Sequence, residues 1–512
     1  MLATCGDYRY YALTQEDLDL FDRLLPYDHP LQDLFNLIDW ERLAGGLQPY
    51  FSDKRGCPSL PPILWLKLEY LRCHYRLTDR EVCDRASTDI AFRWYLQLPF
   101  RCDPPSASGL CRFRSRLGLE GYQSVFDEVV RLAREQGLIK DRMRLKDASH
   151  VIACVAIPVA VQLLGQLRDR LLCQIDPIAP EISAGFRVAA AQIREETRGQ
   201  KAETQLPPRI QLLQDILEWI DEEKPTTELS DAWSQLVQTR QLAEKVLRDK
   251  TNPKEPEKIV SLVDTDAHRG RHGDYYDGYK VDILVDADSR LITQIMVLSP
   301  TASEAESAYA MLSREQEIYE NDIENVSIDG AGWNGEILEK LESPEGLNIK
   351  AFVPPRRSSN TKYFANTEFE LSADNQSLTC PAGKTSTQRN VHKDGKRICF
   401  RFPRTACETC LLLSACMKGL KDGDAGRSVT KSHFENSLDR MRRRSKGEEY
   451  KSVRHEHPAV ERTLNDVMNR CDGRHARYRG QPKVNAQQLL CGTVSNIKQM
   501  VRLLLRGLST EC

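Results

Sequence analysis

The sequence lacks a long apolar run. Its most apolar stretch, residues 151–164, is shorter than the roughly 20 residues that cross a bilayer, and it contains Pro158 and Gln162. We expect this stretch to form buried core. The first residues, MLATCGDYRYY, carry charge early and contain no apolar segment of the kind that a secretory signal needs. We therefore expect a cytoplasmic protein without a membrane partner.

The sequence also lacks a large net charge. The formal charge is −2 over 512 residues, because acidic stretches such as EEKPTTELSD offset arginine-rich ones such as RMRRRSK and RCDGRHARYRG. Local clusters, rather than the total charge, decide whether a protein can bind nucleic acid. The near-neutral total therefore does not exclude a DNA partner.

The length allows two to four folded units, since one domain takes roughly 100–200 residues. Changes of pattern along the chain predict a helical N-terminal domain, a core of strands in two segments, a helical insertion, a cysteine-containing insertion, and a C-terminal part made of helices. In that order, the predicted ranges are 1–140, 141–160 with 258–358, 161–257, 359–440 and 441–512.

The N-terminal part is predicted to be mostly helical. In LTDREVCDRASTDIAFRWYLQL, Thr78 caps a helix with a charged first turn and apolar residues at helical spacing. PSASGLCRFRSRLG starts a basic helix after a Pro-Ser turn. Short helices with a basic one among them are compatible with a DNA-binding domain, and equally with a helical bundle of any other purpose.

The fold class that we predict is α/β, with a mixed sheet flanked by helices. Residues 143–156 predict a strand, and GYKVDILVDADSRLITQIMVL predicts a hairpin around the turn-forming DADSR. A helix over residues 303–320 and the strands ENVSIDG and EGLNIKAFVPP follow. This order of hairpin, helix and further strands is the order of an RNase H-like fold, with a loop-rich insertion before the last helices.

Three distant acidic residues lie in settings suited to metal-binding carboxylates. Asp147 opens a β-branched strand, Asp329 ends an apolar strand before two glycines, and Glu461 lies on an amphipathic helix. Close carboxylates repel each other by about 4 kcal/mol per pair at an effective dielectric near 20, and Mg²⁺ or Mn²⁺ would offset this. Taken singly, the three could instead be a solvated edge charge, a turn cap and a surface glutamate.

The whole chain resembles bacterial insertion-sequence transposases of the DDE type. The resemblance is carried by SLPPILWLKLEYLRCHYRLTDREVCDRASTDIAFRWYLQL, DTDAHRGRHGDYYDGYKVDILVDADSRLIT, SIDGAGWNG and VERTLNDV with RYRGQPKVNAQQLLCGTVSNIKQMV. It implies that Asp147, Asp329 and Glu461 bind two metal ions and that the enzyme cuts and rejoins transposon ends. It also implies terminal inverted repeats and target DNA as partners, and a homodimer or larger synaptic complex.

The chain departs from the family at two positions. Members often have an arginine four residues before the glutamate and a lysine or arginine seven after it, and these positions are His457 and Met468 here. Arg454 and Arg462 could substitute for them. Asp264 and Asp266 also lie beside strands and could compete for the metal, although the family does not usually count this pair among the catalytic residues.

One group among the sixteen cysteines predicts a zinc site. In a cytoplasmic chain, cysteines are expected to be reduced thiols or metal ligands rather than disulfides. Cys380, in a CPAGK turn, and Cys407, Cys410 and Cys416 could hold a structural Zn²⁺, with Cys399 as a possible replacement for one of them. Related transposases often carry such cysteines in the insertion before the catalytic helix. Reduced thiols in a loop region are the alternative.

Basic residues flank the helix that carries Glu461. Such clusters would supply salt-dependent, sequence-independent contacts to DNA phosphates, whereas a single basic run would be explained equally well as a solvated helix face. The predicted DNA-binding residues are Arg442, Arg443, Arg444, Arg454, Arg462, Arg474, Arg477 and Arg479.

Three functions remain open from the sequence. The leading hypothesis is a DDE transposase that catalyses metal-dependent strand cleavage and transfer at the ends of an insertion sequence. A catalytically inactive, transposase-derived DNA-binding protein is the second, and His457 and Met468 are the features that favour it. A different RNase H-like nuclease, such as a resolvase, is the third, and the two insertions disfavour it.

Overall fold

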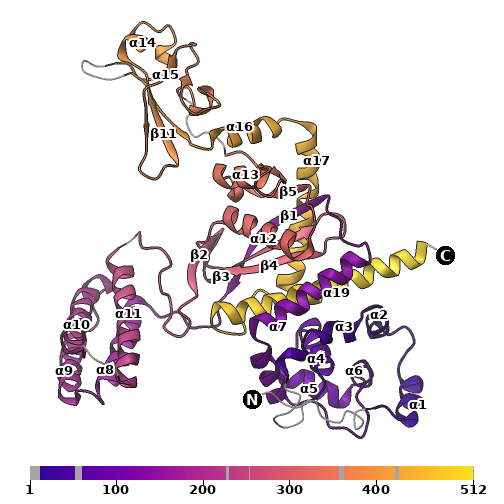
Figure 1. The fold of residues 1–512 in the computed structure, drawn as a ribbon. Helices are drawn as coiled ribbons and strands as arrows, with labels where there is room; N and C mark the ends of the chain where they lie inside the picture. The colour runs from indigo at the N-terminus through magenta and orange to yellow at the C-terminus, as the bar shows by residue number, and fades with distance from the viewer. Residues whose placement is uncertain are drawn as a thin grey trace.

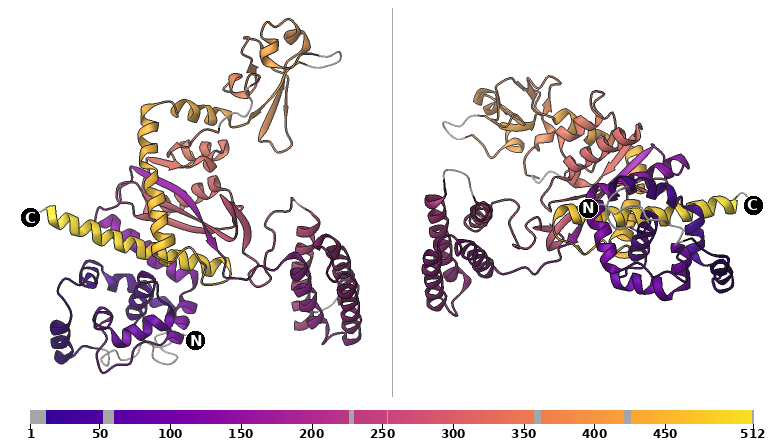
Figure 2. Two further views of the ribbon diagram at one scale, coloured as in Figure 1. Left: turned by 180° about the vertical axis from the view of Figure 1, so that it is seen from behind. Right: turned by 60° about the horizontal axis from the view of Figure 1, so that its bottom comes forward.

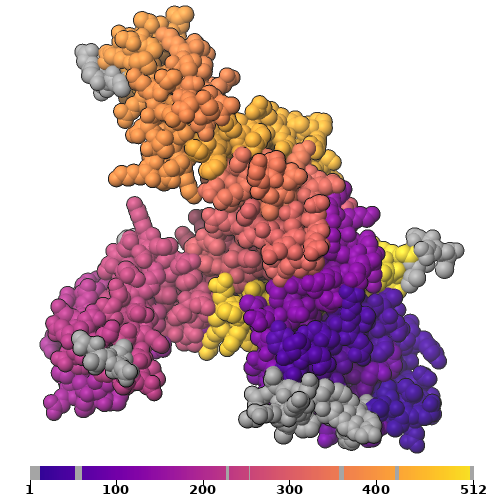
Figure 3. Space-filling model, in the orientation of Figure 1, coloured from indigo at the N-terminus to yellow at the C-terminus, as the bar shows by residue number. Residues whose placement is uncertain are grey.

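The computed structural model describes residues 12–51, 60–225, 230–252, 254–356, 362–420 and 426–510. A central sheet lies in the middle of the molecule, with the N-terminal helices on one side of it (Figure 1). A helical bundle and a cysteine-bearing lobe project from the centre as separate bodies, as the space-filling view shows (Figure 3). The fold is mixed α/β, as predicted.

Side-chain caps define where the N-terminal helices begin. Thr78 forms a capping box with Glu81 at the start of α5, which confirms the predicted helix start, and Ser106 caps α7. Helix α4 is buried on nearly all sides and lies at the centre of this region. The helices are α1 Gln15–Leu24, α2 Pro30–Leu37, α3 Trp40–Gly45, α4 Pro62–His74, α5 Asp79–Thr88, α6 Ile90–Leu96 and α7 Ala107–Glu135.

The central sheet is mixed. Strand β3 pairs with β2 and then β4 along one edge and with β1 along the other, all antiparallel. On the far side of β1, β5 and then β6 run parallel to it, so the order is β2/β4–β3–β1–β5–β6. The strands are β1 Met143–Ile152, β2 His268–His272, β3 Asp274–Asp286, β4 Ile292–Leu298, β5 Asn325–Ile328 and β6 Lys350–Phe352. The predicted hairpin and the later strands are confirmed.

Helices cover both faces of this sheet. One face packs on α12, α13 and α16 around Leu284, Met311 and Leu341. The other face shares one continuous hydrophobic core with α18, α19 and the N-terminal helices, and α19 lies along α7 in both orientations (Figure 2). The helices are α12 Glu304–Tyr319, α13 Gly335–Glu342, α16 Glu435–Arg444, α17 Glu448–Glu456, α18 Pro458–Asn465 and α19 Gln481–Thr510.

The apolar stretch over residues 151–164 is buried core only at its ends, Val151, Leu163 and Leu164, and the prediction was wrong for residues 152–162. Strand β1 ends where Ile152 N–H donates to the Arg474 carbonyl, and the chain then leaves the sheet. Val159 is 64% exposed in this connection, and burial resumes only at Leu163. Among the described residues, no helix is both long and apolar enough to cross a membrane.

The connection leads into a four-helix bundle with its own core. Leu167, Leu171, Ile216 and Leu236 are buried inside it. The helical character predicted for this stretch is confirmed, and the chain returns to the sheet at β2 (Figure 1). The helices are α8 Ala160–Ile175, α9 Pro180–Glu196, α10 Ala202–Glu223 and α11 Asp231–Thr251.

The cysteine-bearing lobe contains more regular structure than the loop-rich insertion that we predicted. Two three-stranded sheets surround a small core of Phe369, Leu378, Phe400 and Val429. The strands have two to five residues, too short for an alternating pattern to be recognised in the sequence. They are β7 Glu370–Leu371, β8 Leu378–Thr379, β9 Thr385–Ser386, β10 Arg389–Val391, β11 Arg397–Arg401 and β12 Ser428–Ser432, with α14 Arg404–Glu408 and α15 Leu413–Cys416.

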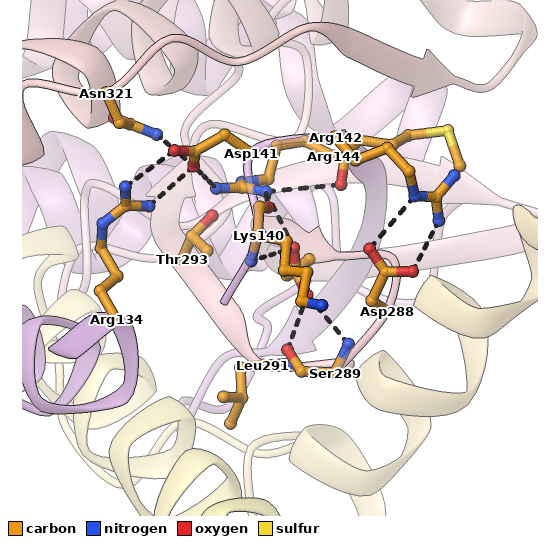
Figure 4. Close-up of polar contacts among 12 residues, drawn as sticks. Arg134, Lys140, Asp141, Arg142, Arg144, Asp288, Ser289, Leu291, Thr293 and Asn321 are labelled. Carbon is orange, nitrogen blue, oxygen red and sulfur yellow. Dashed lines mark hydrogen bonds and ion pairs between the residues drawn. The ribbon is translucent and has the colours of Figure 1, made fainter. Parts of the chain in front are cut away.

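A buried charge network secures the start of β1. The Arg144 side chain is fully buried, and its guanidinium pairs with Asp286 at 3.0 Å, Glu315 at 2.7 Å and Asp141 at 3.0 Å. Asp141 also accepts from Arg134 on α7 (Figure 4). The network therefore links β1 to α7, α12 and the β3–β4 hairpin.

Candidate active site

Asp147 lies on the central strand of the sheet. Successive side chains of a strand point to opposite faces, so Lys146 and Asp147 diverge. Lys146 is fully buried and its ammonium lies 3.0 Å from Asp282. Asp147 is half-buried and points to the other face, on which α18 packs. One of its oxygens accepts from the Ala148 N–H at 2.8 Å.

Asp329 follows directly after β5 and is brought next to Asp147 by the strand register. Lys146 is paired with Ile328 in the parallel ladder, so the next residues of the two strands are neighbours. Asp329 caps the short turn that follows, with Oδ1 accepting from the Ala331 N–H at 3.1 Å. The turn is tight: a Cβ on Gly332 would lie 2.5 Å from the Ile328 side chain. Asp329 is therefore both a turn cap and a member of the cluster.

Glu461 reaches the same region from α18. This helix packs against β1 through buried Val460, Thr463 and Leu464, which leaves Glu461 exposed. The alternation of buried and exposed residues is that of an amphipathic helix, as predicted.

Electrostatics show that the three acids interact. Burial raises the pKa of Asp147 to about 6, and the negative charges of Asp329 and Glu461 contribute to this rise. Burial also raises the pKa of Asp329, as does the charge of Glu304. None of the three carboxylates forms an ion pair within the part of the chain that the structure describes. The structure thus places Asp329 next to Asp147, and Glu461 close enough for its charge to act on Asp147, but in the described residues the three are not arranged as ligands of one ion.

One arginine lies beside the three carboxylates. Arg454, on α17, donates to Ser327 Oγ at 3.0 Å and to the Ile328 carbonyl at 2.9 Å, directly before Asp329. Burial lowers its pKa, while the charges of Asp329, Glu461 and Asp147 act in the opposite direction. The cation is held at the site by the end of β5.

The two positions at which the sequence departs from the family pattern face inward here. His457 is buried with its Nδ1 3.0 Å from Ser327 Oγ, and burial lowers its pKa to about 4, so the ring is neutral at pH 7. Met468 is 1% exposed in a π-helical turn, Asp466–Arg470. Neither side chain can contact DNA phosphates in this arrangement, whereas Arg454 lies close to the acids.

Sequence reasoning missed the polar layer behind the site. Glu304, at the start of α12, lies 3.5 Å from Lys146 and 3.4 Å from Lys280, and its charge acts on Asp329. The only available signal was a lysine next to Asp147 in a strand that is otherwise largely apolar. Such a lysine needs a buried acid when both faces of the sheet are covered.

Asp264 and Asp266 have a structural role that differs from the one predicted for Asp147, Asp329 and Glu461. Asp264 accepts from Tyr279 Oη at 2.6 Å and from the Gly480 N–H at 3.1 Å, and Asp266 accepts from the Gln481 N–H at 2.9 Å. The pair therefore anchors the start of α19 to the sheet.

Four of the predicted zinc ligands surround one small pocket. Cys380, Cys407, Cys410 and Cys416 line it, and Cys399 is not among its lining residues. Burial raises the pKa of Cys416, and the charges of the other three act in the same direction. Among the described residues, no three His, Cys, Asp or Glu side chains are already arranged as ligands of one ion, at this pocket or elsewhere. The zinc site stays a prediction.

Apart from Arg454, described above, the predicted DNA-binding arginines fall into two groups. Arg442, Arg444, Arg474 and Arg477 are engaged within the chain: Arg442 pairs with Glu435 at 2.8 Å, Arg444 with Glu342, and Arg477 with Asp472, while Arg474 donates to the His150 carbonyl at 2.9 Å. Arg443, Arg462 and Arg479 are exposed. The second group is freer to meet phosphates.

Two family models match the chain. One, described as a transposase domain (DUF772), covers residues 19–116, and the other, described as a transposase DDE domain, covers residues 379–501. No curated protein matches. Glu461 lies inside the second segment, whereas Asp147 and Asp329 lie between the two.

Both matched segments are similar to transposase domains. Together they support an insertion-sequence transposase of the DDE type, which confirms the family resemblance seen in the sequence.

Proposed function

We propose that the chain is a DDE transposase with an RNase H-like catalytic core, which cleaves and transfers DNA strands at the ends of an insertion sequence. The strand order supports the fold: β4, β3 and β1 are antiparallel neighbours, β2 extends the β4 edge of β3, and β5 and β6 run parallel beyond β1. The core would comprise residues 141–160 and 258–358, with the remaining predicted domains arranged around it.

The convergence of Asp147, Asp329 and Glu461 is the observation that carries this proposal. The charges of Asp329 and Glu461 act on Asp147, and none of the three carboxylates forms an ion pair within the described chain. Such an all-oxygen donor set suits Mg²⁺ or Mn²⁺, so the three residues fit the metal by the chemistry of their donors, and metal binding would draw them into one ligand set. Bound metal would activate a water or 3′-hydroxyl and stabilise the leaving oxygen.

The chain's own residues would position the acids and the DNA. The turn after β5 fixes the Asp329 carboxylate, the packing of α18 fixes Glu461, and Arg454 supplies a cation beside both. Exposed Arg462, which follows Glu461 on α18, and exposed Arg443, near the end of α16, would contact phosphates of terminal repeats or target DNA. Assembly as a dimer or larger synaptic complex, and a structural Zn²⁺ at the cysteine pocket, belong to the same proposal.

A plasmid nicking assay tests the proposed chemistry. Supercoiled plasmid carrying the element's ends is incubated with the protein and Mg²⁺ or Mn²⁺, and end-specific nicks are mapped. Asp329→Ala should abolish the nicks, whereas Asp322→Ala, which removes an exposed acid from the loop before β5, should leave them. Nicking by Asp329→Ala at the wild-type rate would refute the assignment.

The burial of His457 and Met468 favours the second candidate, an inactive DNA-binding descendant, because two customary phosphate contacts are missing. Specific binding to the element's ends without nicks, in either metal, is the result expected from that protein. The Arg454→Gln variant distinguishes the two candidate functions. In an active transposase it should lower the nicking rate, whereas an inactive DNA-binding protein shows no nicking with or without the substitution.

A further inference from the structure

A second charged site lies behind the helix that carries Glu461. A cleft of about 400 Å³ opens where α2, α4, α18 and α19 meet, and Thr463 and Asp466 are among its lining residues. Each helical residue turns by about 100°, so Thr463, two residues after Glu461, points to the opposite side of α18. The cleft is therefore separate from the three carboxylates.

The lining of this cleft is rich in cations. Arg290, Arg470, Lys498 and Arg502 line it together with the carboxylates of Asp33 and Asp466, an excess of two positive charges. Arg470 pairs with Asp466 at 3.2 Å. The other three cations form no ion pair with any carboxylate of the described chain. Their charges are available to a ligand.

His74 lines the cleft without adding charge. Burial, and the positive charge of Lys498, lower its pKa to about 4, and its ring lies 2.9 Å from Tyr70 Oη. The positive character of the cleft therefore rests on the arginines and the lysine and does not change between pH 6 and pH 8, a range well above that pKa.

Arg290 occupies a backbone position that does not suit arginine. Its φ is +62° in the turn between β3 and β4, a left-handed conformation that favours glycine or asparagine. Its N–H donates to the Asp286 carbonyl at 2.9 Å and closes the turn. The turn itself does not require an arginine, so we attribute the role of Arg290 to its charged side chain. Glycine can replace Arg290 without backbone strain.

We propose that this cleft binds the phosphodiester backbone of DNA. The inference rests on the proposed function, which makes DNA the substrate. Charge complementarity favours a polyanion, and both segments matched by transposase models contribute to the walls: Asp33 and His74 from the first, Lys498 from the second. DNA bound in this cleft would contact both the N-terminal helices α2 and α4 and the C-terminal helix α19.

Salt-dependent binding tests this site. Affinity for a labelled duplex of arbitrary sequence is measured by fluorescence anisotropy over a salt series without divalent metal. Each lost phosphate contact reduces the slope of log K against log salt by about 0.9. Arg290→Gly should reduce it by about 0.9, and Arg290→Gly with Lys498→Gln and Arg502→Gln by up to about 2.7.

Two controls make the result specific. Arg198→Gln removes one charge from a side chain that is 78% exposed in the distant bundle and should leave the slope unchanged. Because glycine suits the turn, Arg290→Gly should keep the wild-type thermal transition, so a loss of affinity would not reflect unfolding.

An unchanged salt slope in the triple variant overturns the inference. The same holds if the slope is unchanged while the oligomeric state shifts in sedimentation, which would make the cleft a protein interface. The outcomes remain distinct from those of the nicking assay. Wild-type nicking with an unchanged slope refutes only the cleft, and nicking by Asp329→Ala refutes only the proposed chemistry.

Discussion

Replacing Arg144 by methionine tests whether the buried charge network holds β1 in place. The guanidinium is fully buried between Asp286 and Glu315, whose side chains are also fully buried. Methionine fills similar space but leaves two carboxylates without their cation. We expect the sheet to be destabilised locally while the bundle is unaffected.

The expected loss is about 3–5 kcal/mol, the usual cost of leaving a buried charge without its partner. The two acids are not equally dependent on Arg144. Asp286 keeps hydrogen bonds from the Ser289 N–H and hydroxyl, at 2.9 and 2.8 Å, whereas Glu315 keeps only that of the Thr293 hydroxyl among the described residues. Most of the loss should therefore come from Glu315.

Hydrogen exchange followed by mass spectrometry is the suitable assay, because separate cores make global melting a mixture of transitions. Peptides covering β1 and β3 should exchange faster in Arg144→Met by the factor that 3–5 kcal/mol predicts, on the order of 100-fold or more. Peptides from α8 and α10 serve as an internal control. Adding Glu315→Gln should recover part of the protection, since it removes the uncompensated charge.

Wild-type protection of β1 in Arg144→Met would refute this reasoning. So would failure of Glu315→Gln to recover any protection, because the loss would then come from packing rather than from charge.

Three further predictions concern the sites. The pKa of Asp147 in the folded protein, about 6, lies above its ordinary value, so the metal-free site gains stability as the pH falls through 6. The affinity for Mn²⁺, measured by titration calorimetry, should therefore strengthen from pH 5 to pH 7. Asp147→Asn should remove this pH dependence. Purified protein should contain one zinc by metal analysis; Cys407→Ser should lose it and Cys111→Ser, an exposed cysteine, should not. Gly332→Ala should cost about 1–3 kcal/mol through overpacking, lowering both thermal stability and nicking rate.

The elements with strong local signals could be predicted from the sequence. The capping residues Thr78 and Ser106 mark helix starts, and the turn between β3 and β4 is encoded by DADSR flanked by β-branched residues. These signals act over a few residues and do not depend on the rest of the fold. Asp329 was recognisable for the same reason, as an acid between a strand and a glycine turn.

Features set by distant neighbours could not be predicted. The apolar connection around Val159 has the composition of core, and only the position of the bundle leaves it exposed. Arg444 belongs to a basic run that resembles a DNA-binding cluster, but Glu342, far away in the sequence, pairs with it. The periodicity of a sequence predicts which face of an element is apolar, but it does not predict which charged side chains will form ion pairs.

The meeting of the three acids depends on the register of β1, and polar pairs specify that register. Both faces of the sheet are covered, so apolar alternation alone would specify it weakly. A slip of one residue would turn Asp147 to the opposite face. It would also withdraw the Lys146 ammonium from Asp282 and Glu304 and leave those acids without their cation. The buried lysine therefore opposes the slip that would dismantle the carboxylate cluster, which explains why an internal charge precedes the first acid.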